Sequence, residues 1–318
     1  MTLRWGIVTA GKISHDFVNA FNSYPNVGEQ IIAAVAARDM NRATEFAKLH
    51  KIGKVFDSYQ KMAESNDIDI AYIGALNPDH YHITKLFLEN GKHVLCEKPL
   101  CLNHKQVQSL VNISKQNKLF LMEAIWSRFS PVYLALEKEI QAGKLGEIKH
   151  VEANFGAPIA TVDRLRKKEL GGSAVLDIGV YTLQFAQFVF KDEPIKVTYE
   201  GGKRAVLNVD STVMLWNKAT VVGTKGRMTE PLNFPHTLIH LDGTVEKHSL
   251  HTSNIPYVCD NTAAGLVYQA LEVEKCIRKG LLESPRMSHK DSLVLAKLED
   301  AVRKQIGVHY DVDDEEFP

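Results

Sequence analysis

The chain has 318 residues, enough for two domains of ordinary size. Its 38 basic and 38 acidic side chains balance, so charge gives no reason to expect binding to nucleic acid or to an acidic membrane surface. We find no secretory-signal pattern and no apolar run near the ~20 residues that cross a membrane. The four cysteines lack metal-ligand spacing. These features predict a cytoplasmic protein without a metal site.

Short apolar segments alternate with segments of helical periodicity through the first 125 residues. The alternation predicts a Rossmann-type α/β domain, with a doubly wound parallel sheet, over residues 1–125. The apolar run IIAAVAA (31–37) is typical of a strand covered on both faces. In chain order, we expect strands at 3–9, 30–37, 54–56, 70–73, 93–96 and 120–123, and helices at 14–22, 41–50, 58–64, 80–90 and 103–116.

The pattern changes after this point and predicts an α+β domain over residues 126–318. Turn signals, GG at 201 and DG at 242, separate strand-like stretches, which indicates a mainly antiparallel open sheet. We expect helices at 132–142, 174–188, 265–279 and 290–305, strands at 196–200, 212–216 and 237–241, and a solvated acidic tail.

The stretch GIVTAGKIS (6–14) lies where the first strand of a dinucleotide-binding domain would turn into its helix. The full fingerprint spaces small residues as G-x-G-x-x-G, and the corresponding positions here are Thr9, Gly11 and Ser14. Gly11 would let the backbone approach a pyrophosphate, and a helix from about Lys12 would direct free N–H groups at it. Taken alone, the stretch fits an ordinary strand-to-helix turn equally well.

The end of the second predicted strand carries arginines. An NAD-specific site usually has an acidic residue about twenty positions after the loop, on the ribose hydroxyls. Here Arg38 follows the strand and Arg42 lies one helical turn later. A guanidinium can stack on adenine and bind a 2′-phosphate, which favours NADP over NAD. We interpret Asp39, the competing acid, as a helix cap; Arg38 as a plain surface charge stays an alternative.

The segment LCEKPL (95–100) follows a predicted parallel strand at the sheet edge where open α/β sheets bind ligands. Together with further motifs it resembles the Gfo/Idh/MocA oxidoreductase family over nearly the whole chain. Within that family it is similar to the branch that oxidises trans-dihydrodiols and D-xylose with NADP. The resemblance implies that GIVTAGKIS binds NADP despite its missing glycines. The further motifs are NPDH (77–80), MEAIWSRFSP (122–131), GGSAVLDIGVY (171–181), VGTKG (222–226) and GLLESP (280–285).

The resemblance implies that Lys98 and Tyr181 carry the chemistry. An alcohol that loses a hydride must also lose a proton, and tyrosine, with an ordinary pKa of about 10, needs help to accept one near neutral pH. One ammonium at ~4 Å supplies roughly the ~4 kcal/mol required. Either Lys98 or Tyr181 could take the proton. Asp177 lies four residues before Tyr181, on the same face if the segment is helical, and either orients the substrate or Lys98 or is a structural carboxylate.

The resemblance also implies a set of binding residues. Trp126 and Phe155 would form an apolar wall for a flat substrate, although aromatic side chains are more often plain core. Glu97 would hold Lys98 or a ribose hydroxyl. His80 is either a cofactor contact or a helix-start residue. The cofactor set comprises Thr9, Gly11, Lys12, Ile13, Arg38, Arg42, Asn77, His80, Glu97 and Lys98.

The second domain departs from the family pattern in one place. The stretch STVMLW (211–216) is followed, after only two residues, by ATVVGTKG (219–226), where the similar enzymes have a further strand. About one strand is missing, so the chain must re-pair strands, expose an edge or lose order locally. The resemblance implies a homodimer formed through this sheet, and the missing strand puts that dimer in question. A nucleotide-binding variant without turnover is therefore the alternative to an active dehydrogenase.

Overall fold

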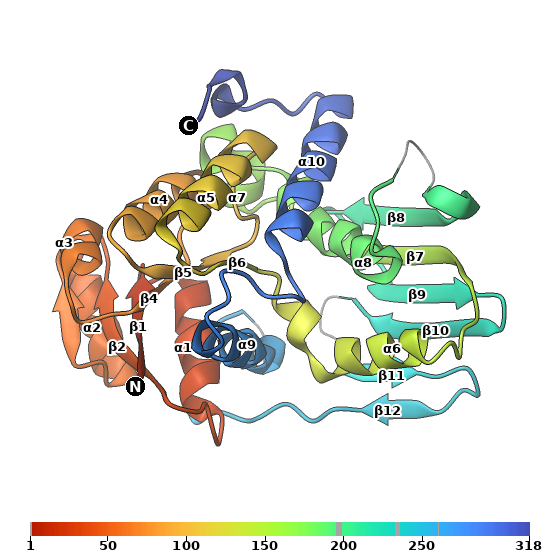
Figure 1. Ribbon diagram of the computed structural model, residues 1–318, viewed down its shortest axis with the longest axis horizontal. Helices are drawn as coiled ribbons and strands as arrows, with labels where there is room; N and C mark the ends of the chain where they lie inside the picture. The colour runs from red at the N-terminus through yellow and green to blue at the C-terminus, as the bar shows by residue number, and fades with distance from the viewer. Residues whose placement is uncertain (1, 195–198, 233–235, 260) are drawn as a thin grey trace. The chain divides into compact units, whose positions relative to one another are not determined.

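The computed structural model describes residues 2–194, 199–232, 236–259 and 261–318 (Figure 1). The chain divides into two compact units: residues 1–126, 250–293 and 312–318 form the first, and residues 127–249 and 294–311 form the second. Two segments of the first unit thus come from beyond residue 126. The division into domains at residues 1–125 and 126–318 stays a prediction.

The first unit contains a six-stranded parallel sheet in the order β3-β2-β1-β4-β5-β6. Its strands are β1 (Leu3–Val8), β2 (Gln30–Ala36), β3 (Lys54–Phe56), β4 (Ile70–Ile73), β5 (His93–Glu97) and β6 (Leu121–Ala124). Its helices include α1 (Lys12–Ser23), α2 (Met40–His50), α3 (Tyr59–Glu64), α4 (His80–Glu89), α5 (His104–Asn117) and α9 (Val267–Arg278). The predicted doubly wound sheet is confirmed. The strand order reverses between β1 and β4, the point at which such sheets bind ligands.

Local sequence signals explain where the helices of this unit begin. The side chain of Asp39 accepts hydrogen bonds from the N–H groups of Asn41 and Arg42, which confirms it as the cap of α2. Ser58 and Asn103 cap α3 and α5 in the same way. Each of these caps satisfies an N–H group that has no partner inside its helix.

The second unit contains a six-stranded sheet in the order β12-β11-β10-β9-β7-β8. All neighbouring strands are antiparallel except β7 and β8, so the mainly antiparallel sheet is confirmed. The strands are β7 (Ile148–Gly156), β8 (Arg204–Asp210), β9 (Lys218–Gly223), β10 (Gly226–Pro231), β11 (Thr237–Ile239) and β12 (Val245–Lys247). The helices include α6 (Pro131–Gln141), α7 (Asp163–Arg166) and α8 (Val180–Phe190), and α10 (His289–Gln305) follows later in the chain.

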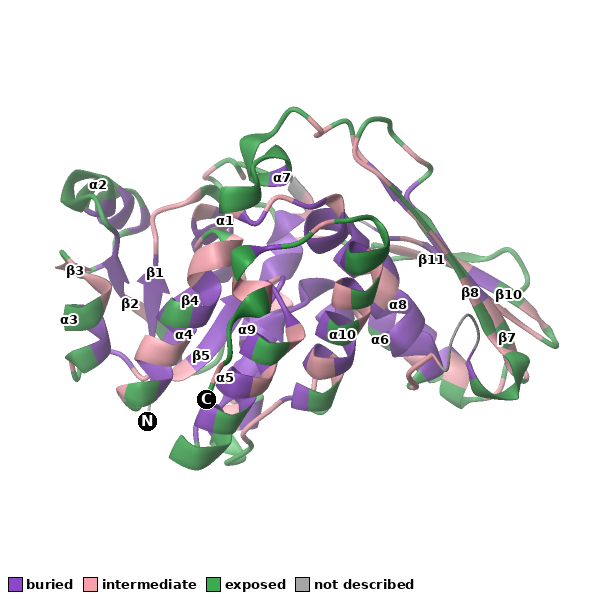
Figure 2. Ribbon diagram, turned by 90° about the horizontal axis from the view of Figure 1, so that it is seen from above, coloured by how far each residue is buried: buried purple, intermediate pink, exposed green. Residues whose placement is uncertain are grey.

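Helices α6 and α8 supply the apolar side chains that pack on β7 and β9 to form the core of the second unit. Helix α8 is almost entirely buried (Figure 2). The helical stretch 168–190 that contains it is the one described segment long and apolar enough to cross a membrane, and 89% of its most apolar window is buried inside the protein. Such burial is what the core helix of a globular protein shows.

The predicted strand at 212–216 is wrong. Strand β8 ends at Asp210, whose Oδ1 accepts hydrogen bonds from the N–H of Thr212 (2.7 Å), its hydroxyl (2.6 Å) and the N–H of Val213 (3.2 Å). These bonds turn the chain out of the sheet, so Met214 and Trp216 lie exposed, Trp216 at 87%. In this sheet β8 is the edge strand and pairs parallel to β7, while β9 lies between β7 and β10.

Two further predictions concern the segment just before β8. The predicted strand at 196–200 lies largely outside the described residues. The turn expected at GG is present, with Gly201 at φ 72° and Gly202 at φ 73°, a left-handed conformation that glycine adopts without steric cost.

The exposed 211–217 loop generates a fluorescence prediction. Of the three tryptophans, Trp5 and Trp126 are buried and only Trp216 is open to solvent. We expect acrylamide to quench one strongly accessible emission component in the wild type and Trp216→Phe to remove it. The substitution should change the free energy of unfolding by no more than about 0.5 kcal/mol, as is usual for exposed sites. Unchanged quenching in Trp216→Phe, with loss of quenching in Trp126→Phe instead, would contradict this loop conformation.

Candidate active site

The loop after β1 adopts the backbone of a dinucleotide-binding turn without its first glycine. Thr9 has φ 82°, a region that β-branched residues rarely adopt. Its Oγ1 donates to the carbonyl oxygen of Gly74 (2.9 Å) and lies 3.1 Å from Ser14 Oγ. Strain of this kind costs about 1–3 kcal/mol and persists only where surrounding contacts hold it. The two side-chain contacts of Thr9 are such a restraint.

Gly74, at the end of β4, is a site residue that sequence reasoning missed. A side chain there would collide with Ser14 Oγ, so only glycine lets β4 and the start of α1 pack this closely. The third glycine of the usual fingerprint serves such close packing. Here Ser14 and Gly74 share that role, and the signal in the sequence was a glycine directly after the apolar stretch IAYI.

The N-terminus of α1 is arranged to receive an anion. Gly11 is its N-cap, and no side chain among the described residues caps this end. The first backbone N–H groups of α1, those of Lys12 and Ile13 among them, therefore point out of the helix without an intrahelical acceptor. Unsatisfied N–H groups and the helix dipole together favour a phosphate at this position.

The arginines predicted to select the cofactor lie beside this loop. Arg42 donates from Nη2 to the carbonyl oxygen of Ala10 (3.2 Å), which ties α2 to the loop after β1. Arg38 is exposed at the end of β2. Burial raises the pKa of Tyr59, while the charges of Arg38 and Arg42 act in the opposite direction, so the two guanidinium groups and this phenol form one cluster. Tyr59 was not foreseen from the sequence.

The EKP segment places a lysine next to a buried carboxyl group. The Tyr72 hydroxyl donates to Glu97 Oε1 (2.7 Å), and the backbone N–H of Lys98 approaches Glu97 Oε2 (3.3 Å). Burial raises the pKa of Glu97 to about 7, against the opposing effects of the Tyr72 hydrogen bond and the Lys98 charge. Lys98 itself is half-buried and precedes Pro99 through a cis peptide bond.

His80 braces the same segment from α4. It is fully buried, with Nδ1 2.7 Å from the carbonyl oxygen of Pro99 and Nε2 3.1 Å from that of Ala75. Burial lowers its pKa, although both carbonyl groups act to raise it. Asn77 is partly exposed in the short 3-10 helix Asn77–Asp79 that leads into α4. His80 is thus both the first residue of α4 and a link to the EKP segment.

The second unit contains three of the four predicted substrate residues, Phe155, Asp177 and Tyr181. Asp177 is buried in a π-helical turn (Val175–Gly179) that runs into α8, and Arg164 of α7 forms an ion pair with it. The Tyr181 ring lies 5.6 Å from the Phe155 ring of β7. Arg164 as the partner of Asp177 was missed, because nothing in the local sequence links residues 13 positions apart. Single π-turns occur frequently at functional sites.

Trp126 belongs to the first unit. It is buried, and its ring packs so closely on Gly265 that a Cβ there would lie 2.9 Å from the ring. The structure thus holds Trp126 in place through a glycine 139 positions away, and Gly265 is a further residue that sequence reasoning did not single out.

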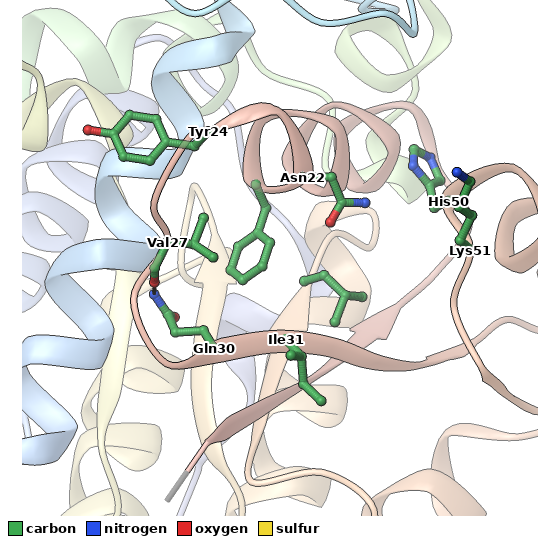
Figure 3. A pocket seen from close by; sticks show the side chains of 9 residues that line it. Asn22, Tyr24, Val27, Gln30, Ile31, His50 and Lys51 are labelled. Atoms are coloured by element: carbon green, nitrogen blue, oxygen red, sulfur yellow. Dashed lines mark hydrogen bonds between the residues drawn. The ribbon is translucent and has the colours of Figure 1, made fainter.

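The described pocket lies elsewhere in the first unit (Figure 3). It has a volume of about 300 Å³ and contains none of the predicted site residues. Its lining comes from the end of α1, the start of β2 and the end of α2, which is the amino edge of the sheet: Phe21, Asn22, Tyr24, Val27, Gln30, Ile31, Ile32, His50 and Lys51. The carboxyl edge instead carries Thr9, Arg38, Gly74 and Lys98. Among the described residues, no group of three or more histidine, cysteine and acidic side chains is placed to hold a metal.

Comparison with known proteins gives the family. Residues 3–125 match the NAD-binding Rossmann fold model of the Gfo/Idh/MocA oxidoreductase family, and residues 133–216 match its C-terminal domain model. The chain is 39% identical to a trans-1,2-dihydrobenzene-1,2-diol dehydrogenase of Danio rerio and 38% identical to one of Homo sapiens, with 98% of this chain and 99% of each relative covered. The first of these alignments spans 335 positions, more than this chain has residues, so the relative carries residues without a counterpart here.

Solved structures agree on the fold. A levoglucosan dehydrogenase in complex with NADH and levoglucosan superposes with a TM-score of 0.81 at 16% identity. A 3-ketoreductase from Actinomadura kijaniata in complex with NADP and TDP-benzene superposes with a TM-score of 0.76 at 24% identity. Each comparison covers 96% of this chain and 98% of the other. With both family domains matched and a full-length relative at 39% identity, the chain belongs to the Gfo/Idh/MocA oxidoreductase family.

Proposed function

We propose that this chain is an NADP-dependent dehydrogenase that transfers hydride between the nicotinamide and a cyclic trans-diol or an aldose such as D-xylose. The observation that carries the proposal is the cluster at the carboxyl edge of the first sheet. An uncapped helix N-terminus lies between two arginines on one side and Lys98 on the other. The naming of the relatives as dihydrodiol dehydrogenases supports the substrate class.

The residues present fit the cofactor. The first turn of α1 offers N–H groups to the pyrophosphate, and the close approach of Ser14 to Gly74 keeps that turn against the sheet. Arg38 and Arg42 are the groups that would bind a 2′-phosphate, since a guanidinium presents a fork of donors that matches phosphate oxygens. The Oδ1 of Asp39 accepts both capping bonds of α2, which supports the reading of Asp39 as a helix cap and not as the ribose ligand.

Lys98 and Tyr181 are the proposed proton-transfer pair. The bound nicotinamide would accept the hydride, and the proton of the substrate hydroxyl would pass to the Tyr181 oxygen or to Lys98 Nζ. Phe155 packs beside Tyr181 and would exclude water from one side of the phenol. Asp177, neutralised in part by Arg164, would orient a substrate hydroxyl or Lys98. Trp126 would complete the apolar wall.

Two further proposals concern assembly and location. We propose that the protein acts in the cytoplasm on small molecules and forms a homodimer through its C-terminal sheet. The second candidate function is an NADP(H)-binding protein without turnover, and the observation that favours it is that residues 211–217, predicted to include a strand, lie outside the sheet.

Removal of the proton acceptors should abolish turnover. We expect Lys98→Met and Tyr181→Phe each to lower kcat for a panel of a trans-dihydrodiol, D-xylose and D-glucose by about 10²-fold or more, the usual contribution of a positioned acid or base. Steady-state NADPH formation measures this. Lys61→Met on the surface and Tyr199→Phe, whose ring packs on Phe190, are the matched controls and should keep wild-type rates. A wild type that binds NADPH but turns over none of the panel would favour the non-catalytic candidate.

Cofactor preference should depend on Arg38. In Arg38→Gln, the ratio of kcat/KM for NADP to that for NAD should fall by about tenfold or more, because a charge-assisted bond to the 2′-phosphate is worth about 1.5–3 kcal/mol. Lys48→Gln, which removes an exposed charge from the neighbouring helix α2, should leave the ratio unchanged. An unchanged ratio in Arg38→Gln would show that Arg38 is a plain surface charge.

Glu97 should make stability pH-dependent near neutrality. Its pKa is about 7 in the folded protein and 4.5 as an ordinary glutamate, so the folded state binds the proton more tightly and loses stability as the pH rises from 4.5 to 7. The loss is at most about 3 to 4 kcal/mol, from about 2.5 pKa units at 1.36 kcal/mol each. Urea unfolding should show this slope in the wild type and in the surface control Glu45→Gln, and a flatter one in Glu97→Gln. Parallel curves would mean that Glu97 titrates normally.

A further inference from the structure

Residues 253–259 of the first unit run along α1 without forming helix or strand. The start of this segment, residues 253–255, is hydrogen-bonded to Asn19 of α1. The Asn19 Nδ2 donates to the carbonyl oxygen of Ile255 (2.7 Å), and the Ser253 hydroxyl donates to Asn19 Oδ1 (2.5 Å). Asn19 is buried, so these bonds are shielded from water.

The end of the segment, residues 258 and 259, is hydrogen-bonded to Asp16. The N–H of Val258 donates to one carboxylate oxygen (2.6 Å) and the N–H of Cys259 donates to the other (2.8 Å). Asp16 has no exposed surface, and a buried carboxylate is tolerated only when its oxygens are hydrogen-bonded. Charge-assisted bonds of this kind are roughly twice as strong as neutral ones. Asp16 and Asn19 are three residues apart and therefore face the same side of α1.

A histidine pair adds a third attachment between these two. His15 Nε2 lies 3.1 Å from the carbonyl oxygen of Pro256, and His15 Nδ1 lies 3.1 Å from His50 Nε2 at the end of α2. A carbonyl oxygen only accepts, so the His15 proton is on Nε2 and His50 donates to His15 Nδ1. Three consecutive contacts thus fasten residues 253–259, which we call the clasp, to one face of α1.

Helix α1, to which Asp16 belongs, also contacts the buried pair that precedes Lys98. Burial raises the pKa of Tyr72 well above its ordinary value, and the charge of Glu97 adds to the effect. The Tyr72 ring stacks on Phe17 of α1 (centroids 3.8 Å apart) and its hydroxyl donates to Glu97. Asp16 therefore connects the first turns of α1, the clasp and the Tyr72–Glu97 pair.

We propose that Asp16 is a positioning residue for the nucleotide, because it fixes the clasp against α1 and thereby holds both the anion-binding end of this helix and the Tyr72–Glu97 pair. The inference rests on the proposed nucleotide site. Coupling between two sites is reciprocal, so a nucleotide bound at the start of α1 stabilises the clasp as much as the clasp stabilises nucleotide binding.

The wild-type protein tests the coupling by amide hydrogen exchange with and without saturating NADPH. Exchange in residues 253–259 should slow at least fivefold when NADPH binds, while exchange in the middle of α5, remote from the clasp contacts, should stay unchanged. Bound NADPH without any slowing in the clasp would overturn the inference and leave the proposed function standing. Failure to bind NADPH or NADH would overturn the proposed function and this inference with it.

Two substitutions separate positioning from plain stability. Asp16→Asn keeps the shape of the side chain but replaces one acceptor oxygen with an NH₂ group that faces a backbone N–H. Ser253→Ala removes one hydrogen bond, the one to Asn19, from the start of the clasp. We expect the Kd for NADPH, measured by its fluorescence, to rise about tenfold or more in Asp16→Asn and less than twofold in Ser253→Ala, with the Tm of both recorded. Asp16→Glu, which keeps both acceptors, should recover part of the affinity. Equal Kd changes in Asp16→Asn and Ser253→Ala, or an unchanged Kd in Asp16→Asn, would overturn the proposal.

Discussion

The contact between the loop after β1 and the end of β4 is the constraint on which the candidate cofactor site depends. Thr9 takes a left-handed backbone conformation that normally belongs to glycine, and its hydroxyl bonds to Gly74 and Ser14 hold it there. This conformation sends the chain from β1 into α1 with the helix end uncapped. A dinucleotide turn can therefore form with one glycine of its fingerprint, provided that a second glycine on a neighbouring strand supplies the space.

A buried pair, Tyr72 and Glu97, positions the segment that carries Lys98, the proposed catalytic lysine. Glu97 lies in the core at the end of β5, and its carboxyl group is bonded by Tyr72 from the neighbouring strand β4. Removal of a carboxyl group from water disfavours its charge, which is why its pKa rises to about 7. The residue that carries the proposed chemistry thus follows directly after a group whose charge changes near physiological pH.

The second unit combines one parallel strand pair with an otherwise antiparallel sheet. Strands β7 and β8 can run parallel because the chain between them crosses over through α7 and α8, and this pair lies at the edge of the sheet. Asn217 ties the start of β9 to the end of β7, since its side chain accepts from the N–H of Gly156 (2.7 Å) and donates to its carbonyl oxygen (3.0 Å). Phe155 belongs to the core between this sheet and its helices, Tyr181 packs against that core, and Asp177 is also buried.

The sequence by itself determined the features that depend on local periodicity and on neighbouring residues. The alternation of strands and helices in the first unit, the cap formed by Asp39 and the position of Lys98 at the end of a parallel strand were all predicted from short stretches. The mainly antiparallel second sheet was also foreseen, whereas the strand at 212–216 was not correct. An apolar run there has strand character, but the side chain of Asp210 turns the chain away before it can pair.

Only the tertiary structure decided the contacts between residues far apart in the chain. Gly74 against Ser14, Arg164 with Asp177, Gly265 against Trp126 and Asp16 with the clasp each join segments whose separation carries no local signal. Such contacts arise when packing brings a carboxylate or a small residue to the one place where its partner can satisfy a hydrogen bond or fit the space. Propensity and periodicity describe single elements, and the site is assembled from several of them.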